Sequence, residues 1–139
     1  MTIDQALHTV DELCPNQIER ARKIAWLDTL DRQIFRDVIA RHAPDEDTLE
    51  TFAGYSQDTD PDTALLAKAP YDEIYRFYLE TQINLANKEI DAYNESAALY
   101  GAAWGNYARE YHRTHKSMQP AIHHDFGDAR RDWGNPLKR

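Results

Sequence analysis

The histidines near the C-terminal end of the chain are the residues whose type and spacing come closest to a site for chemistry. His112 and His115 are three residues apart, so on a helix they share one face, and His123 and His124 follow. Imidazole is a zinc ligand, but no acidic or cysteine residue has the spacing that completes a tetrahedral set. The sequence therefore predicts no metal site at these histidines.

A second possible metal site is the segment DTDPDT, Asp58 to Thr63, whose alternating carboxylates are typical of a calcium loop. In such a loop a glycine makes the sharp turn and a glutamate closes the site. Here Thr63 stands in place of the glycine and Ala69 in place of the glutamate. We therefore expect no bound calcium.

Patterns for catalysis or nucleotide binding are weak. Cys14, the single cysteine, lies beside Pro15 at an expected helix end, where a buried or idle thiol is the simpler interpretation. No serine has a nucleophile elbow around it. Gly101 and Gly105 lie inside an expected helix and not between a strand and a helix, so they form no phosphate loop. We predict a protein that is not an enzyme and has no cofactor.

Composition and charge exclude several further classes of protein. The 139 residues suffice for one hydrophobic core, and 42% hydrophobic with 29% charged residues is typical of a folded domain. The net charge of −8 is uneven, because residues 1–108 hold 20 acids and 9 bases whereas residues 109–139 hold 4 and 7. An acidic body repels phosphates, which argues against gripping DNA. No segment resembles a signal peptide or a membrane span, so we expect a soluble cytoplasmic protein.

The elements that position these residues are predicted to be helices. Thr2 and Gln5 have the spacing of a capping box for a short helix that ends before Pro15. Asn16 and Glu19 repeat that spacing before a second helix from about residue 17 to residue 42. Residues 43–69 lack the helical periodicity, so we expect a long acidic loop there. A short strand or hairpin within this loop is an alternative.

A third, long helix is predicted over residues 71–115. Its apolar positions alternate spacings of four and three residues; they are Leu79, Ile83, Ala86, Ile90, Tyr93, Ala97, Tyr100, Trp104, Tyr107 and Tyr111. The sequence YNES at residues 93–96 is a possible break. The sequence therefore predicts an all-α bundle, with a helical domain over residues 1–115 and an extended arm over residues 116–139.

The glycines of this helix suggest a packing surface. Each costs about 1 kcal/mol in a helix interior relative to alanine, and close approach of another backbone is a natural compensation. The partner is either the second helix of the same chain or a neighbouring subunit. The predicted packing residues are Ala97, Tyr100, Gly101, Trp104, Gly105, Tyr107 and Tyr111.

The segments WLDTLDRQIFRDVI (26–39) and FAGYSQ to HRTH (52–115) cover more than half of the chain. With the pieces PYDEIY, IDAYN and HRTH, this order of features resembles small proteins of tailed phages and prophages that are classed as head-tail connector, or adaptor, proteins. The resemblance implies a helical bundle that assembles into a homo-oligomeric ring, often a 12-mer, beneath the portal protein. Such a ring lies in the neck of the virion, after assembly in the host cytoplasm.

In that family the ring extends the DNA channel and provides a platform for a tail or stopper protein, and DNA passes through without specific binding. A C-terminal segment commonly reaches the portal, which would give that role to the arm and its residues Phe126, Arg130, Arg131 and Trp133. A frayed terminus is the other interpretation of the arm.

An acidic channel wall would let DNA slide. The candidate wall or mouth residues are Asp45, Glu46, Asp47, Asp58, Asp60 and Asp62, unless they simply lie on a solvated outer loop. A different class also stays open, namely a small acidic binding or regulatory protein, antitoxin-like or a DNA mimic. A connector must close a ring, whereas a mimic can act as a monomer or dimer.

Overall fold

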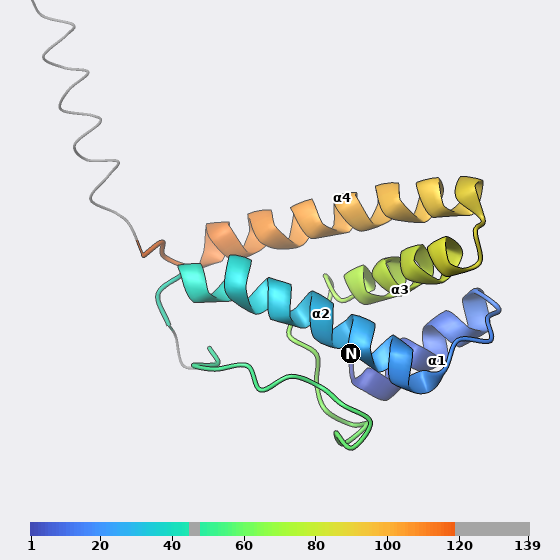
Figure 1. The fold of residues 1–139 in the computed structure, drawn as a ribbon. Helices are drawn as coiled ribbons and strands as arrows, with labels where there is room; N and C mark the ends of the chain where they lie inside the picture. The colour runs from blue at the N-terminus through green and yellow to red at the C-terminus, as the bar shows by residue number, and fades with distance from the viewer. Residues whose placement is uncertain (45–47, 119–139) are drawn as a thin grey trace, which may run out of the picture.

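The computed structural model describes residues 1–44 and 48–118. Its elements are α1 (Ile3–Leu13), α2 (Arg20–Asp37), a 3-10 turn η1 (Ile39–Arg41), α3 (Glu73–Ala86) and α4 (Ile90–Thr114) (Figure 1). Within these residues there are no strands, only two isolated bridges, Thr2 with Ala64 and His42 with Ser117. The all-α prediction is confirmed.

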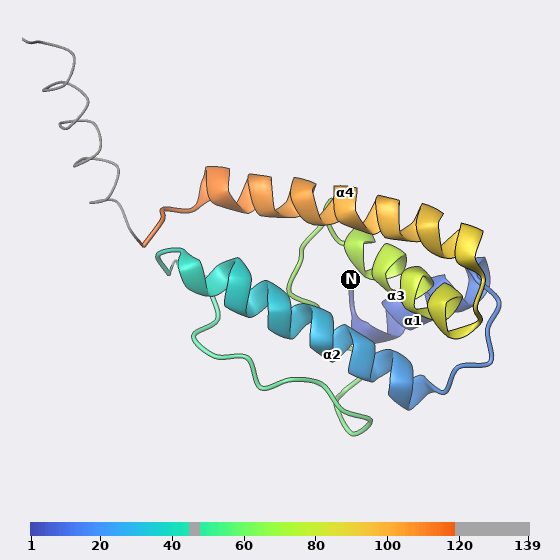
Figure 2. The ribbon, with the colours of Figure 1, turned by 45° about the horizontal axis from the view of Figure 1, so that its top comes forward.

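Helix α3 lies at the centre and packs against α1, α2 and α4. Ile74, Tyr75, Leu79 and Ile83 give it an apolar stripe that is completely buried. Burying each such side chain is worth about 1.5–3 kcal/mol, so α3 organises the core. Figures 1 and 2 show α4 running along one edge of the bundle, with one side against α3 and the other turned away from the remaining helices.

The first helix follows the prediction, and the second begins later than predicted. Thr2 and Gln5 form the reciprocal capping box at the start of α1. The predicted capping pair of Asn16 and Glu19 is wrong, because the Asn16 side chain accepts a hydrogen bond from the Ile18 N–H at 3.1 Å and donates to the Cys14 carbonyl at 2.9 Å. Asn16 therefore holds the turn between the helices, and α2 starts at Arg20.

The single helix predicted over residues 71–115 is wrong, because the segment forms two helices, α3 and α4, that pack side by side and are joined by a tight turn. Lys88, in the left-handed conformation with φ of 59°, reverses the chain, and Glu89 donates its N–H to the Asn84 carbonyl at 3.0 Å. The break thus lies at residues 87–89, and residues 93–96 lie inside α4. Each helix presents an apolar stripe to the other, so the spacing of apolar residues continues through the turn.

The loop before α3 has neither helix nor strand over residues 48–69, as predicted; part of it runs along α2, and its last part crosses toward the start of α3 (Figure 2). Gly54 allows its closest approach to α2. Its φ is +90°, and a Cβ there would lie 2.6 Å from Arg32 Nη2 and 2.7 Å from Asp28 Oδ1. Only glycine fits this position without displacing that ion pair.

No helix in the described part of the chain has both the length and the apolar character required to cross a lipid bilayer.

Candidate functional site

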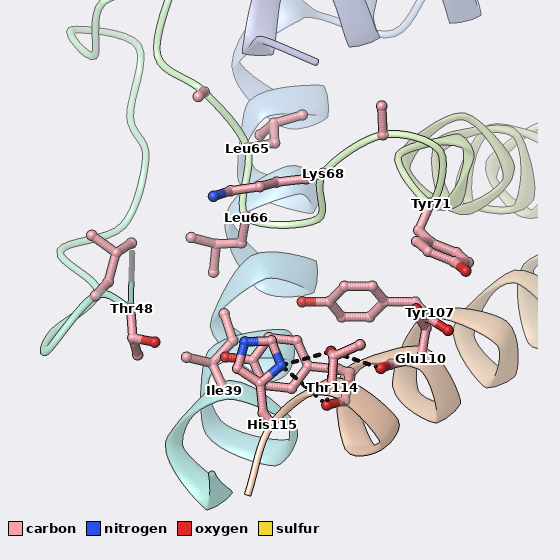
Figure 3. A pocket seen from close by; sticks show the side chains of 14 residues that line it. Ile39, Thr48, Leu65, Leu66, Lys68, Tyr71, Tyr107, Glu110, Thr114 and His115 are labelled. Atoms are coloured by element: carbon pink, nitrogen blue, oxygen red, sulfur yellow. Dashed lines mark hydrogen bonds between the residues drawn. The ribbon is translucent and has the colours of Figure 1, made fainter. Parts of the chain in front are cut away.

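An open cavity of about 520 Å³ lies where the C-terminal half of α4 meets η1 and the loop. Apolar walls come from Ile39 and from Leu49, Leu65 and Leu66 of the loop, and aromatic walls from Tyr71 before α3 and from α4 residues such as Tyr107 (Figure 3). Lys68 and Glu110 bring charges to its lining. The cavity suits an apolar or aromatic group carrying a polar end.

A buried carboxylate holds the loop wall of this cavity in place. Asp31 of α2 is fully buried and accepts hydrogen bonds from the Tyr55 hydroxyl at 2.5 Å, the Tyr75 hydroxyl at 2.7 Å and the Leu66 N–H at 3.1 Å. The Tyr75 oxygen in turn accepts from the Ala67 N–H at 2.6 Å. One side chain thus joins α2, α3 and two parts of the loop.

Burial dominates the electrostatics of this cluster. Desolvation raises the pKa of Asp31 above its usual value, although its three hydrogen-bond donors partly oppose the shift. Burial, and then the neighbouring Asp31 carboxylate, raise the pKa of both Tyr55 and Tyr75 well above the usual range. Because its oxygens are occupied by these donors, Asp31 serves to position the loop and not to transfer protons to a ligand.

Aromatic rings of α4 form the opposite wall. Tyr107 is buried, with its ring centroid 6.5 Å from that of Tyr71 and 6.0 Å from that of Tyr111. Its hydroxyl points into the space among the lining side chains (Figure 3). Glu110, beside it, is hydrogen-bonded to Tyr71 and to Arg113, and the Arg113 bond is the main cause that lowers the pKa of this carboxyl.

Three histidines lie close together beside the cavity, and one of them, His115, lines it. His42 is buried; its Nδ1 lies 2.6 Å from the Val38 carbonyl, and its Nε2 lies 2.7 Å from Nδ1 of His112. Since a carbonyl oxygen only accepts, Nδ1 of His42 donates to it, and in the neutral ring Nε2 is then the acceptor that faces His112. The ring of His115 stacks on Tyr111, with centroids 3.8 Å apart.

Both histidines of the predicted pair adjoin His42, but in different ways: His112 is hydrogen-bonded to it, whereas His115 stacks on Tyr111 with its ring centroid 6.3 Å from that of His42. Among the residues that the structure describes, no group of three or more His, Cys, Asp or Glu side chains is placed to hold a metal ion. His123 and His124 lie outside the described residues.

The predicted packing residues of α4 divide between two faces. Tyr100, Trp104, Tyr107 and Tyr111 pack onto the core of the same chain, and Tyr78 of α3 meets Tyr100 with ring centroids 5.2 Å apart. Ala97 is half-buried. Gly101 and Gly105 point elsewhere, because a Cβ on either would meet nothing within 4 Å. The aromatic seam therefore has its partner within the chain, in α3 and not in the second helix, whereas the glycines adjoin open space.

The structure describes three of the six acidic residues that were predicted to face a channel. Asp58, Asp60 and Asp62 are exposed at a turn of the loop, where the Asp62 N–H donates to Asp60 Oδ1 at 2.9 Å. Asp45, Glu46 and Asp47 lie outside the described residues, as do the arm residues Phe126, Arg130, Arg131 and Trp133. Of the predicted arm, the structure describes only residues 116–118, in which Lys116 and Met118 pair with the end of η1.

Two functional residues were missed from the sequence. Asp31 lies four residues after Leu27 and three before Ile34, and this position on the apolar stripe is a signal of a buried carboxylate. No sequence signal joins His42 to His112, which are 70 residues apart.

Cys14 behaves as an unreactive thiol in this structure. It is half-buried at the end of α1, with Sγ 3.9 Å from Asn84 Oδ1. Desolvation, followed by the nearby Glu80 and Glu89, raises the pKa of the thiol. We expect the native protein at pH 8 to react with a disulfide reagent roughly several-fold more slowly than the urea-unfolded protein, because only the thiolate reacts. Equal rates in stopped-flow measurements would contradict this.

Comparison of the chain with family models, with curated proteins and with solved structures gave no match.

Proposed function

We propose that this protein is a structural component of a tailed-phage neck, a connector whose copies form a ring beneath the portal. The observation that carries the proposal is the outer face of α4. Gly101 and Gly105 lie on that face with open space around them. Glycine destabilises a helix interior, and no packing contact within the described part of the chain offsets that loss at these two positions. A neighbouring subunit that packs closely there would compensate for it.

Two further features agree with this proposal. The sequence segments 26–39 and 52–115 resemble the connector family, and a ring is built from heterologous contacts that such a face could supply. The exposed carboxylates of Asp58, Asp60 and Asp62 are suited to a channel wall or mouth, where they would repel the DNA backbone. In this arrangement the arm, residues 116–139, is the element that meets the portal.

The assembly state tests the proposal directly. We expect negative-stain images and sedimentation of the concentrated protein, alone or mixed with its portal, to show closed rings. A monomer that fails to bind the portal at every salt concentration would overturn it. A monomer or dimer that instead captures a basic partner would favour the alternative, an acidic binding or regulatory protein.

Substitution of both glycines separates folding from assembly. In Gly101→Leu/Gly105→Leu the new side chains meet no atom of the same chain within 4 Å of Cβ, and leucine is a better helix former. We therefore expect the free energy of unfolding to rise by about 1 kcal/mol per site while rings are lost. Ala25→Leu, a comparable enlargement at an exposed position of α2, is the control that should keep the rings. Rings that persist in the double variant would contradict a close contact at α4.

A further inference from the structure

The cavity beside α4 has the properties of a peptide-anchor site. Its volume of about 520 Å³ lies inside the range of about 300–1,000 Å³ common for binding pockets. Leu49, with half of its surface exposed, stands at this cavity, and Leu66 and Ile39 add apolar wall (Figure 3). The Tyr107 hydroxyl supplies a hydrogen-bonding group within it, whereas both oxygens of Glu110 already accept from Arg113.

The C-terminal segment of the chain begins next to this cavity. His115, one residue beyond α4, lines the cavity, and the next residues run beside η1. The Lys116 carbonyl accepts from the Ala43 N–H at 2.7 Å, and the Met118 N–H donates to the Arg41 carbonyl at 3.2 Å. Residues 119–139 therefore begin three residues from a side chain that forms the cavity wall.

The composition and length of residues 119–139 fit the cavity. The segment carries two aromatic residues, Phe126 and Trp133, among four Lys and Arg residues and three acids. Residues 1–118 hold 21 acids and 12 Lys and Arg residues, so the two parts have opposite net charge. Fifteen residues separate Trp133 from Met118, and a chain of that length spans up to about 50 Å when extended. A tether this short gives an effective concentration of about 1 mM or more.

We propose that the cavity binds the C-terminal segment of the same chain, with the indole of Trp133 as its anchor. The indole offers a large apolar surface for the leucine and isoleucine walls and an N–H for the Tyr107 oxygen, which phenylalanine lacks. Arg130 and Arg131, just before Trp133, bring positive charge toward Glu110. This docking describes the free subunit and does not depend on ring formation; a contact of the arm with the portal would require Trp133 to leave the cavity.

Methyl NMR on the full-length protein tests the site. In Trp133→Ala we expect the methyl resonances of Ile39, Leu49 and Leu66 to lose their ring-current shifts. The methyls of Leu13 and Leu85, which are about as exposed as Leu49 but lie at the other end of the bundle, should not move. Phe126→Ala is the matched control and should leave the cavity methyls in place. Unchanged cavity methyls in Trp133→Ala, or a loss seen only in Phe126→Ala, would overturn the assignment of Trp133.

A substitution that places a charge in the cavity lining tests whether the cavity binds the indole. Leu49→Glu should move the Trp133 indole N–H resonance to its position in an unfolded peptide, whereas Leu85→Glu, at a residue 55% exposed against 50% for Leu49, should not. The same result in both variants would contradict the site. Adding unlabelled wild-type protein to labelled Trp133→Ala shows whether the indole in the cavity comes from the same chain or from a second copy. Restoration of the cavity shifts would show that a second copy supplies the indole and would overturn docking within one chain.

Discussion

Asp31→Ala is expected to lower the free energy of unfolding by roughly 3–5 kcal/mol, as is usual when one partner of a buried charged network is removed. The substitution leaves the buried Tyr75 hydroxyl and the part-buried Tyr55 hydroxyl and Leu66 N–H without their acceptor. Each unsatisfied buried donor costs about 1–3 kcal/mol. Urea denaturation followed by circular dichroism measures the change.

Asp37→Ala is the matched control for this effect. Asp37 is also an aspartate of α2, but it is partly exposed and pairs with Arg36 on the surface. We expect a much smaller change there, because solvent screens most surface pairs. Equal losses in the two variants would show that the Asp31 cluster does not stabilise the fold.

The protonation of Asp31 gives the same cluster a pH signature. Its folded pKa lies above the ordinary 3.8, so the folded state holds this proton more tightly than the unfolded state does. The resulting stabilisation is complete below pH 3.8 and is lost as the pH rises through the folded pKa. Relative to Asp31→Asn, the wild-type protein should therefore gain stability as the pH falls from 7 toward 4. A difference that is constant with pH would contradict the raised pKa.

Tyr107→Ala is expected to lower the free energy of unfolding by about 3–5 kcal/mol, the range for removing a large buried aromatic side chain. Tyr107 and Ser96 are the buried residues of α4, and the Tyr107 ring links this helix to Tyr71 before α3. The loss of its ring removes the main apolar attachment of the C-terminal half of α4. Thermal and urea unfolding measure it.

Tyr107→Phe tests whether that effect comes from the ring. The hydroxyl points into the cavity, so its removal should cost at most about 1 kcal/mol. If Tyr107→Phe is as damaging as Tyr107→Ala, the hydroxyl and not the ring carries the stabilisation. Burial raises the pKa of Tyr107, so the side chain is neutral in both comparisons at pH 7.

Much of the fold was predictable from local patterns. The Thr2–Gln5 capping box and the spacing of Leu27, Leu30 and Ile34 gave helices close to those observed. The end of α3 was not predictable in this way, because two helices that face each other repeat the apolar spacing of one long helix. The turn at residues 87–89 depends on the backbone of Lys88, for which the sequence offers no glycine or proline as a signal.

The candidate site was less predictable than the fold, because its parts come from distant segments. The cavity joins loop residues such as Leu49 and Leu66 to Tyr107 of α4, and periodicity does not report such contacts. The predicted packing residues shared a helix, but spacing alone did not distinguish the side of Tyr107 from the side of Gly101. The channel and portal roles of the acidic and arm residues stay predictions.

The placement of Asp31 also bears on the order in which the molecule forms. The partners of this carboxylate are 24, 35 and 44 residues away along the chain, whereas α3 and α4 meet across a turn of three residues. Closing long loops costs more entropy than closing short ones. The hairpin of α3 and α4 can therefore assemble quickly, whereas the loop wall of the cavity beside it depends on contacts that close longer segments of the chain.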